Sequence, residues 1–120
     1  MANEISFSYQ LLITNGSYSS SNVANNSYTQ NAIGASGGVQ TVTTSLTHLD
    51  LGSVTTLGYT LLKNLDPTNY VDVGIDSAGF VGMARLKAGE VGIFRWLPGV
   101  TPSLKANTAT CSVSYLLLQD

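Results

Sequence analysis

The chain has 120 residues and a formal net charge of −2, so it lacks the electrostatic footprint expected of a protein that binds nucleic acid or anionic lipid. Charged residues make up 10% of the chain, against about 25% in an average soluble domain, and no apolar run approaches the length of a membrane helix. Ser, Thr, Asn and Gly fill most polar positions instead. Hydroxyl and amide groups can re-pair inside an interface at a lower cost than charges, so the composition favours assembly with other protein over catalysis.

The first predicted element is a β-strand over residues 5–13. Apolar residues occupy every odd position there, and most of the even positions are polar. A period of two predicts a strand with one buried face. The strand is expected to end at Asn15-Gly16, which is a strong turn signal.

Residues 15–38 have a different composition. They are rich in Ser, Asn and Gly, contain no charged residue and show no clear periodicity. A stretch of this kind predicts either a long surface loop or an arm that becomes ordered on a neighbouring subunit. For the arm, Tyr18 and Tyr28 are the candidate anchors, because Tyr is enriched at protein contacts.

The remainder of the chain predicts short strands separated by turns. Pro or Gly punctuates it about every 8–12 residues, as strand connections require. The expected strands cover residues 39–49, 57–65, 69–76, 79–86, 90–97 and 102–108, and a further strand runs from residue 111. We therefore predict an all-β protein, an antiparallel β-sandwich that is jelly-roll-like and has about eight strands, folded as a single domain over residues 1–120. A single closed barrel is the alternative. The residues expected to be mostly buried are Ile5, Phe7, Tyr9, Leu11, Val73, Ile93, Val113, Tyr115 and Leu117.

Two predicted strands are apolar on both faces. In the C-terminal strand, Leu116 and Leu118 make the second face apolar, so that strand is either central in its sheet or covered by another subunit. In the strand over residues 90–97, Phe94 and Trp96 share one face, and the other face is also apolar. Trp96 is either the centre of a subunit contact or a cap on the edge of the core.

Residues that could act as nucleophile or base are few and lie far apart in the sequence. The single cysteine, Cys111, falls on the buried side of its strand, which predicts an inert thiol. His48 shares a strand face with Asp50, but two ligands do not make a zinc site.

The acidic residues have a structural explanation. Asp66 and Asp76 stand in turns, where their carboxylates can accept bonds from nearby backbone N–H groups, and Asp72 lies on the polar side of its strand. This arrangement lacks the dense carboxylate cluster of a calcium site. We expect no catalytic residue, metal or cofactor.

Four segments of the second half carry a family resemblance. They are Lys63-Asn-Leu-Asp-Pro-Thr-Asn-Tyr-Val-Asp-Val-Gly74, Arg85-Leu-Lys-Ala-Gly-Glu-Val-Gly-Ile-Phe-Arg95, Leu104-Lys-Ala-Asn-Thr-Ala109 and Val113-Ser-Tyr-Leu-Leu-Leu-Gln-Asp120. Over about residues 57–120 the chain resembles small structural proteins of tailed bacteriophages, such as capsid decoration (cement) proteins and head-fibre or tail-associated β-domains. The resemblance implies a β-sandwich component of the virion that is often trimeric, and it transfers no active-site residue.

Two functions follow as expectations. The first is a decoration protein, not an enzyme, that binds the major capsid protein on the outer capsid surface as a homotrimer and stabilises the shell. Such a protein would be assembled in the host cytoplasm without a secretory signal. It would contact neither nucleic acid nor membrane. The second is a carbohydrate- or receptor-binding domain of a fibre or tail, in which aromatic residues such as Tyr59 would contact the ligand. The candidate interface residues are Tyr18, Tyr28, Trp96, Leu116 and Leu118.

Overall fold

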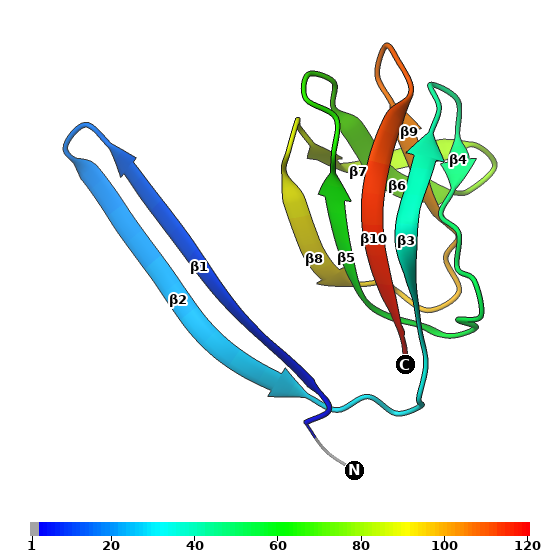
Figure 1. The fold of residues 1–120 in the computed structure, drawn as a ribbon, viewed down its shortest axis with the longest axis horizontal. Coiled ribbons are helices and arrows are strands. Elements are labelled where there is room, and N and C mark those ends of the chain that lie inside the picture. The colour runs from blue at the N-terminus through cyan, green and yellow to red at the C-terminus, as the bar shows by residue number, and fades with distance from the viewer. Residues whose placement is uncertain (1–2) are drawn as a thin grey trace. The chain divides into compact units, whose positions relative to one another are not determined.

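The computed structural model describes residues 3–120, and every regular element in this range is a β-strand (Figure 1). The all-β prediction is therefore confirmed. No helix in the described range is long and apolar enough to cross a membrane. The chain divides into two compact units, Met1–Asn31 and Ala32–Asp120.

The first unit is a β-hairpin. Strand β1 (Ile5–Asn15) pairs antiparallel with β2 (Tyr18–Tyr28) in an unbroken register that joins Asn15 to Tyr18 and Ile5 to Tyr28. The connection is the two-residue turn Gly16-Ser17, in which Gly16 has a φ of 60°, as the first central position of a II′ turn requires. The turn predicted at Asn15-Gly16 is therefore present.

Two expectations for this segment are wrong. Residues 18–28 form a strand and not a loop, because pairing with β1 satisfies their backbone groups although their Ser and Asn side chains give no apolar alternation. The odd residues of β1 are not buried either: Tyr9 and Leu11 are exposed, and Ile5 and Phe7 are half-buried. Their alternation is real, but none of residues 3–31 covers that face of the two-stranded sheet.

The second unit is a sandwich of two four-stranded antiparallel sheets (Figure 1). One sheet has the order β3-β10-β5-β8 and the other has the order β4-β9-β6-β7. The strands are β3 (Ala35–Val42), β4 (Thr47–His48), β5 (Leu57–Asn64), β6 (Val71–Asp76), β7 (Phe80–Leu86), β8 (Val91–Arg95), β9 (Pro102–Ala106) and β10 (Cys111–Gln119).

The strand pairs are nested, and this nesting defines a jelly roll. Within the sandwich β6 pairs with β7, β5 with β8, β4 with β9, and β3 with β10. The pairs are those of one long antiparallel hairpin, rolled so that successive pairs fall in alternate sheets. The jelly-roll prediction is confirmed over residues 32–120, and the two separate sheets are not a single closed barrel.

The predicted strand over residues 39–49 is two strands. Between β3 and β4 the chain turns, and the hydroxyl of Thr43 accepts a bond from the N–H of Ser45 at 3.3 Å. The hydroxyl of Thr47 accepts from the N–H of Thr43, also at 3.3 Å. Local bonds of this kind offer the backbone an alternative to the sheet ladder, so these threonines stabilise a turn within the segment.

The core lies between the two sheets. Of the residues predicted to be buried, Val73, Val113, Tyr115 and Leu117 are in it, but Ile93 is on the outer surface. Among the described residues, the buried hydrophobic side chains that form the core are Val42, Leu49, Val54, Leu57, Leu62, Val71, Val73, Leu86, Trp96, Leu104, Ala106, Cys111, Val113, Tyr115 and Leu117. The sandwich therefore has a full core of its own, which leaves the outer faces of the sheets available for other contacts.

Candidate interaction surfaces

The outer face of the β3-β10-β5-β8 sheet carries a row of apolar residues. The register places Leu116 of β10 beside Leu61 of β5, and Leu61 beside Ile93 of β8. Leu61, Leu116 and Ile93 are 38%, 43% and 47% exposed. On the other side of Leu116 the row ends at Gly37 of β3, where a Cβ atom would lie 2.9 Å from the carbonyl oxygen of Tyr115. We call this row, Gly37–Leu116–Leu61–Ile93, the apolar row.

Further apolar residues flank the row on the same face. They are Val39 of β3, Val91 of β8 and the half-buried Leu118 of β10. The face therefore has an apolar centre that spans four strands. An exposed apolar centre of this kind marks a protein contact more often than a free surface.

Polar groups border the apolar row. At one margin the guanidinium of Arg95 lies 3.0 Å from the carboxylate of Asp120, and its Cζ lies 4.6 Å from the ring centroid of Tyr59. At the other margin Lys63 is exposed and aligned with Val91. An apolar centre with a polar rim is the anatomy of a protein–protein interface.

A second apolar surface, in addition to that of the sandwich, lies on one side of the hairpin. Directly paired residues of an antiparallel ribbon project on the same side, so the odd residues of β1 share a face with the even residues of β2. On that face Tyr9, Leu11 and Ile13 are exposed, and Phe7 stacks on Tyr28 with the ring centroids 5.6 Å apart. The apolar residues of this side come mainly from β1, because the middle of β2 contributes Ser20, Asn22, Ala24 and Asn26 to it. We call this side the apolar face of the hairpin.

The opposite side of the hairpin is polar. It consists of Ser, Thr, Asn and Gln residues, with Leu12 and Val23 as the apolar exceptions. No residue between positions 5 and 31 is charged. The hairpin is therefore an amphipathic ribbon without charges.

The structure distributes the predicted interface residues over three places. Tyr18 and Tyr28 lie at opposite ends of the hairpin's apolar face, and Tyr18 is exposed. Leu116 and Leu118 project from the outer face of the sandwich. Trp96 is 5% exposed and belongs to the core, where its ring packs edge-on against Phe94 at 4.8 Å, so the core-edge alternative fits and the surface contact does not.

Trp96 also lines an apolar cleft of about 330 Å³ at an open edge of the sandwich. The cleft lies between β7 and β8, which are edge strands of the two sheets, and Met83, Phe94 and Leu97 line it as well. Among the described residues, the Trp96 indole nitrogen Nε1 is buried and has no hydrogen-bond partner. A cleft with this lining can accommodate an apolar group.

The residues considered for chemistry have structural partners. The imidazole Nε2 of His48 lies 2.8 Å from a carboxylate oxygen of Asp76, and this bond, with one from the N–H of Gly79, lowers the pKa of Asp76. Burial raises the pKa of the Cys111 thiol, which disfavours the reactive thiolate. Asp72 forms a two-bond ion pair with Arg85.

Asp66 holds a turn in place, as predicted. Its carboxylate accepts bonds from the backbone N–H groups of Asn69 at 2.6 Å and Thr68 at 3.0 Å, and these bonds lower its pKa. Within residues 3–120, His, Cys, Asp and Glu form no group of three or more that could hold a metal ion.

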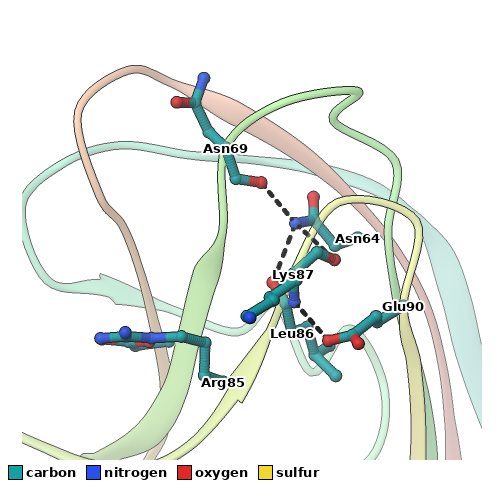
Figure 2. A network of polar contacts seen from close by, with 7 residues as sticks. Asn64, Asn69, Arg85, Leu86, Lys87 and Glu90 are labelled. Carbon is teal, nitrogen blue, oxygen red and sulfur yellow. Dashed lines mark hydrogen bonds and ion pairs between the residues drawn. The ribbon is translucent and has the colours of Figure 1, made fainter. Parts of the chain in front are cut away.

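A buried amide anchors the loops at one end of the sandwich (Figure 2). The side-chain nitrogen of Asn64, which is fully buried, lies 2.8, 3.0 and 3.2 Å from the backbone carbonyl oxygens of Asn69, Leu86 and Lys87. Its side-chain oxygen accepts from the N–H of Asp66 at 3.0 Å. In the connection between β7 and β8, the carboxylate of Glu90 accepts a bond from the N–H of Lys87 at 2.7 Å. Asn64 thereby joins the β5–β6 connection to the β7–β8 connection.

Comparison with protein-family models, with curated proteins and with solved structures gives no match for this chain.

Most of the apolar row was not predicted from the sequence. Leu116 and Leu118 were expected at an interface, but Leu61 was not, and Ile93 was expected in the core. The signal was present in the pair Leu61-Leu62, because two adjacent leucines in one strand must face opposite sides of a sheet.

Proposed function

We propose that this protein is a structural component of a bacteriophage virion: a decoration protein that binds the major capsid protein on the outer capsid surface as a homotrimer and stabilises the shell. The observation that carries the proposal is the exposed apolar row on a sandwich whose core is complete without it. Removing such a face from water is favourable, so the face supports a role in binding other protein. The family resemblance of residues 57–120 supports the virion as the setting.

Stabilisation would come from bridging. A trimer placed over a junction between capsid subunits would contact several of them at once, and the linked contacts would add without further loss of translational freedom. Each contact could then be weak by itself. Bond chemistry is not required, because the work of the protein is to add buried area across joints that internal pressure pulls apart.

The test uses capsids that lack the protein. Purified full-length protein is added, unbound protein is removed by sedimentation, and the temperature of capsid disruption is measured by light scattering. We expect the protein to cosediment with capsids and to raise the disruption temperature. Capsids that bind none of it, or that bind it and break at an unchanged temperature, would contradict the proposal.

A matched pair of variants tests the role of the apolar row. Leu116 and Leu65 are both 43% exposed, but Leu116 is in the row and Leu65 lies in the loop after β5. If the row carries the contacts, Leu116→Asn weakens binding to capsids at least tenfold and Leu65→Asn leaves it nearly unchanged. Equal behaviour of the two variants would remove the row from the binding surface.

The second candidate, a carbohydrate- or receptor-binding domain of a fibre or tail, rests on Tyr18. This tyrosine is 61% exposed and pairs directly with Asn15 beside the hairpin turn, and an exposed aromatic ring beside an amide is a common arrangement for sugar binding. Antibody labelling of virions in electron micrographs separates the two functions, since label on the shell supports decoration and label on a fibre tip supports receptor binding.

A further inference from the structure

We infer that the hairpins of three copies pack together through their apolar faces and hold the trimer together, an inference that rests on the proposed homotrimeric virion protein. The partner of each hairpin is thus the same segment, residues 5–28, of two other copies. The inference starts from the exposed residues Tyr9, Leu11 and Ile13 of β1.

The hairpin needs a covering partner to be stable. A two-stranded ribbon is marginally stable in water at best, and a third strand or a packed layer is normally required. Each strand of this ribbon has 11 residues, which is long for an unsupported hairpin. The odd residues of β1 from Ile5 to Ile13 are all apolar and project on one side of the ribbon. The stability of the ribbon therefore depends on a layer over that side.

A second copy is suited to be that layer for electrostatic reasons. Identical surfaces meet without repulsion when they carry no charge, and residues 5–31 contain none. The edges of the ribbon are also unprotected. Natural edge strands are usually blunted by Lys, Pro or a bulge, whereas β1 and β2 contain no Lys or Pro and pair in an unbroken register.

The open edges of the ribbon favour three copies over two. An 11-residue strand spans about 36 Å and the ribbon is about 10 Å wide, so one face presents on the order of 360 Å². Each copy buries this one face in a dimer or in a trimer, and face packing alone stays below the roughly 1,200 Å² of a stable interface in both. Two ribbons packed face to face leave every edge open, whereas three ribbons around one axis place each edge beside a neighbouring ribbon and bury further area there.

The sidedness of the ribbon agrees with this arrangement. In a three-ribbon bundle the apolar faces point to the axis, and the Ser-, Thr- and Asn-rich faces point to water. A threefold axis along the ribbons also puts each residue at the same height as its two copies. Leu11 of the three copies would then meet near the axis, whereas Leu12 would point outward.

Leu11 and Leu12 provide the test, because they are adjacent leucines on opposite faces, 71% and 59% exposed. In sedimentation equilibrium of the full chain, we expect wild type and Leu12→Asn to be trimers at micromolar concentration. Leu11→Asn is expected to dissociate at a concentration at least tenfold higher than wild type does. A monomeric wild type, or equal dissociation of the two variants, would overturn the inference.

Cross-linking gives an independent readout that holds even if Leu11→Asn precipitates. Under mild oxidation at low protein concentration, Leu11→Cys should form disulfide-linked chain pairs and Leu12→Cys should not. The native Cys111 is 1% exposed and does not compete. Failure of Leu11→Cys to cross-link, or equal cross-linking of both variants, would also overturn the inference.

These outcomes are separable from the proposed function. A monomer that still binds capsids and raises their disruption temperature would disprove the hairpin bundle and leave the decoration role standing. A trimer that depends on Leu11 but never binds capsids would disprove the decoration role and leave the hairpin bundle standing.

Discussion

Asn64 is the polar residue on which the loop architecture at one end of the sandwich depends. It is fully buried, and its amide bonds backbone groups from two different connections. A buried backbone carbonyl that loses its partner costs about 1–3 kcal/mol. The side chain therefore stabilises the fold through groups that belong to other residues.

The first prediction is that Asn64→Ala lowers the free energy of unfolding by about 3 kcal/mol, because it removes the bonds from its side-chain nitrogen to the buried carbonyl of Leu86 and to the partly buried carbonyls of Asn69 and Lys87. Urea denaturation monitored by Trp96 fluorescence measures the change. Asn69→Ala is the matched control, since Asn69 contributes its backbone carbonyl to the network and should cost about 1 kcal/mol or less. Similar losses for the two variants would contradict the role assigned to the Asn64 amide.

The second prediction concerns acid stability. The pKa of Asp66 is lowered by the N–H groups of Asn69 and Thr68, so its carboxylate stabilises the fold above the ordinary pKa of 3.8 and loses this effect as the pH falls below that value. The difference in melting temperature between wild type and Asp66→Asn should be largest near pH 6 and should shrink as the pH drops below about 4. A difference that stays constant or grows in acid would contradict this.

At the scale of elements, strand β7 contains a bulge at Met83, and the facing position on β6, Gly74, admits only the smallest residue. The register with β7 shifts between Val73 and Gly74, and a Cβ atom on Gly74 would collide with the backbone carbonyl of Val81. Bulges of this kind bend a strand and increase its twist. Here the bulge lies beside the open edge of the sandwich, where Gly74 lines the apolar cleft.

The third prediction follows from that collision: Gly74→Ala destabilises the sandwich by about 2–3 kcal/mol, because the backbone of two strands must move apart. Gly92→Ala is the control. A Cβ atom there would meet Leu86 at 3.6 Å, an ordinary contact, and the loss should stay below about 1 kcal/mol. Thermal denaturation of both variants decides the matter, and an unaffected Gly74→Ala would mean that the two strands can move apart at no cost.

Sequence patterns predicted the sandwich well because its turns are marked by Pro, Gly and Asp. The expected strand over residues 57–65 is β5 (Leu57–Asn64), and the one over 102–108 is β9 (Pro102–Ala106). The patterns failed for β1, because its apolar residues are not covered by other residues of the hairpin. The alternation in β1 correctly indicates an amphipathic strand, but it cannot say whether the surface that covers Leu11 comes from this chain or from another.

The same limit explains the candidate surfaces. Alternation assigned Ile93 and Leu117 equally to the core, yet Leu117 is buried and Ile93 is 47% exposed. Which face of β8 points inward is fixed by Phe94 and Trp96, whose larger rings occupy the core. In a strand that is apolar on both sides, the choice depends on packing volume and not on periodicity.

For the whole molecule, the scarcity of charge has a measurable consequence. An assembly stabilised by apolar faces gains little from attraction between charges, so salt has few interactions to screen. The fourth prediction is that the dissociation constant of the proposed trimer changes less than about threefold between 50 mM and 500 mM NaCl. Sedimentation equilibrium at the two salt concentrations measures it, and a change of tenfold or more towards dissociation would indicate ion pairs between subunits.

The nested pairing of the strands also determines when the chain can fold. Leu118 of β10 pairs with Ala35 of β3, residues that are 118 − 35 = 83 positions apart, and β10 lies between β3 and β5 in its sheet. That sheet therefore cannot close until β10 has been synthesised. Such long-range pairing places the folding time in the range of about milliseconds to seconds. In that interval β3 and β5 have unpaired edges, and the newly made chain is most prone to aggregation and depends most on chaperones.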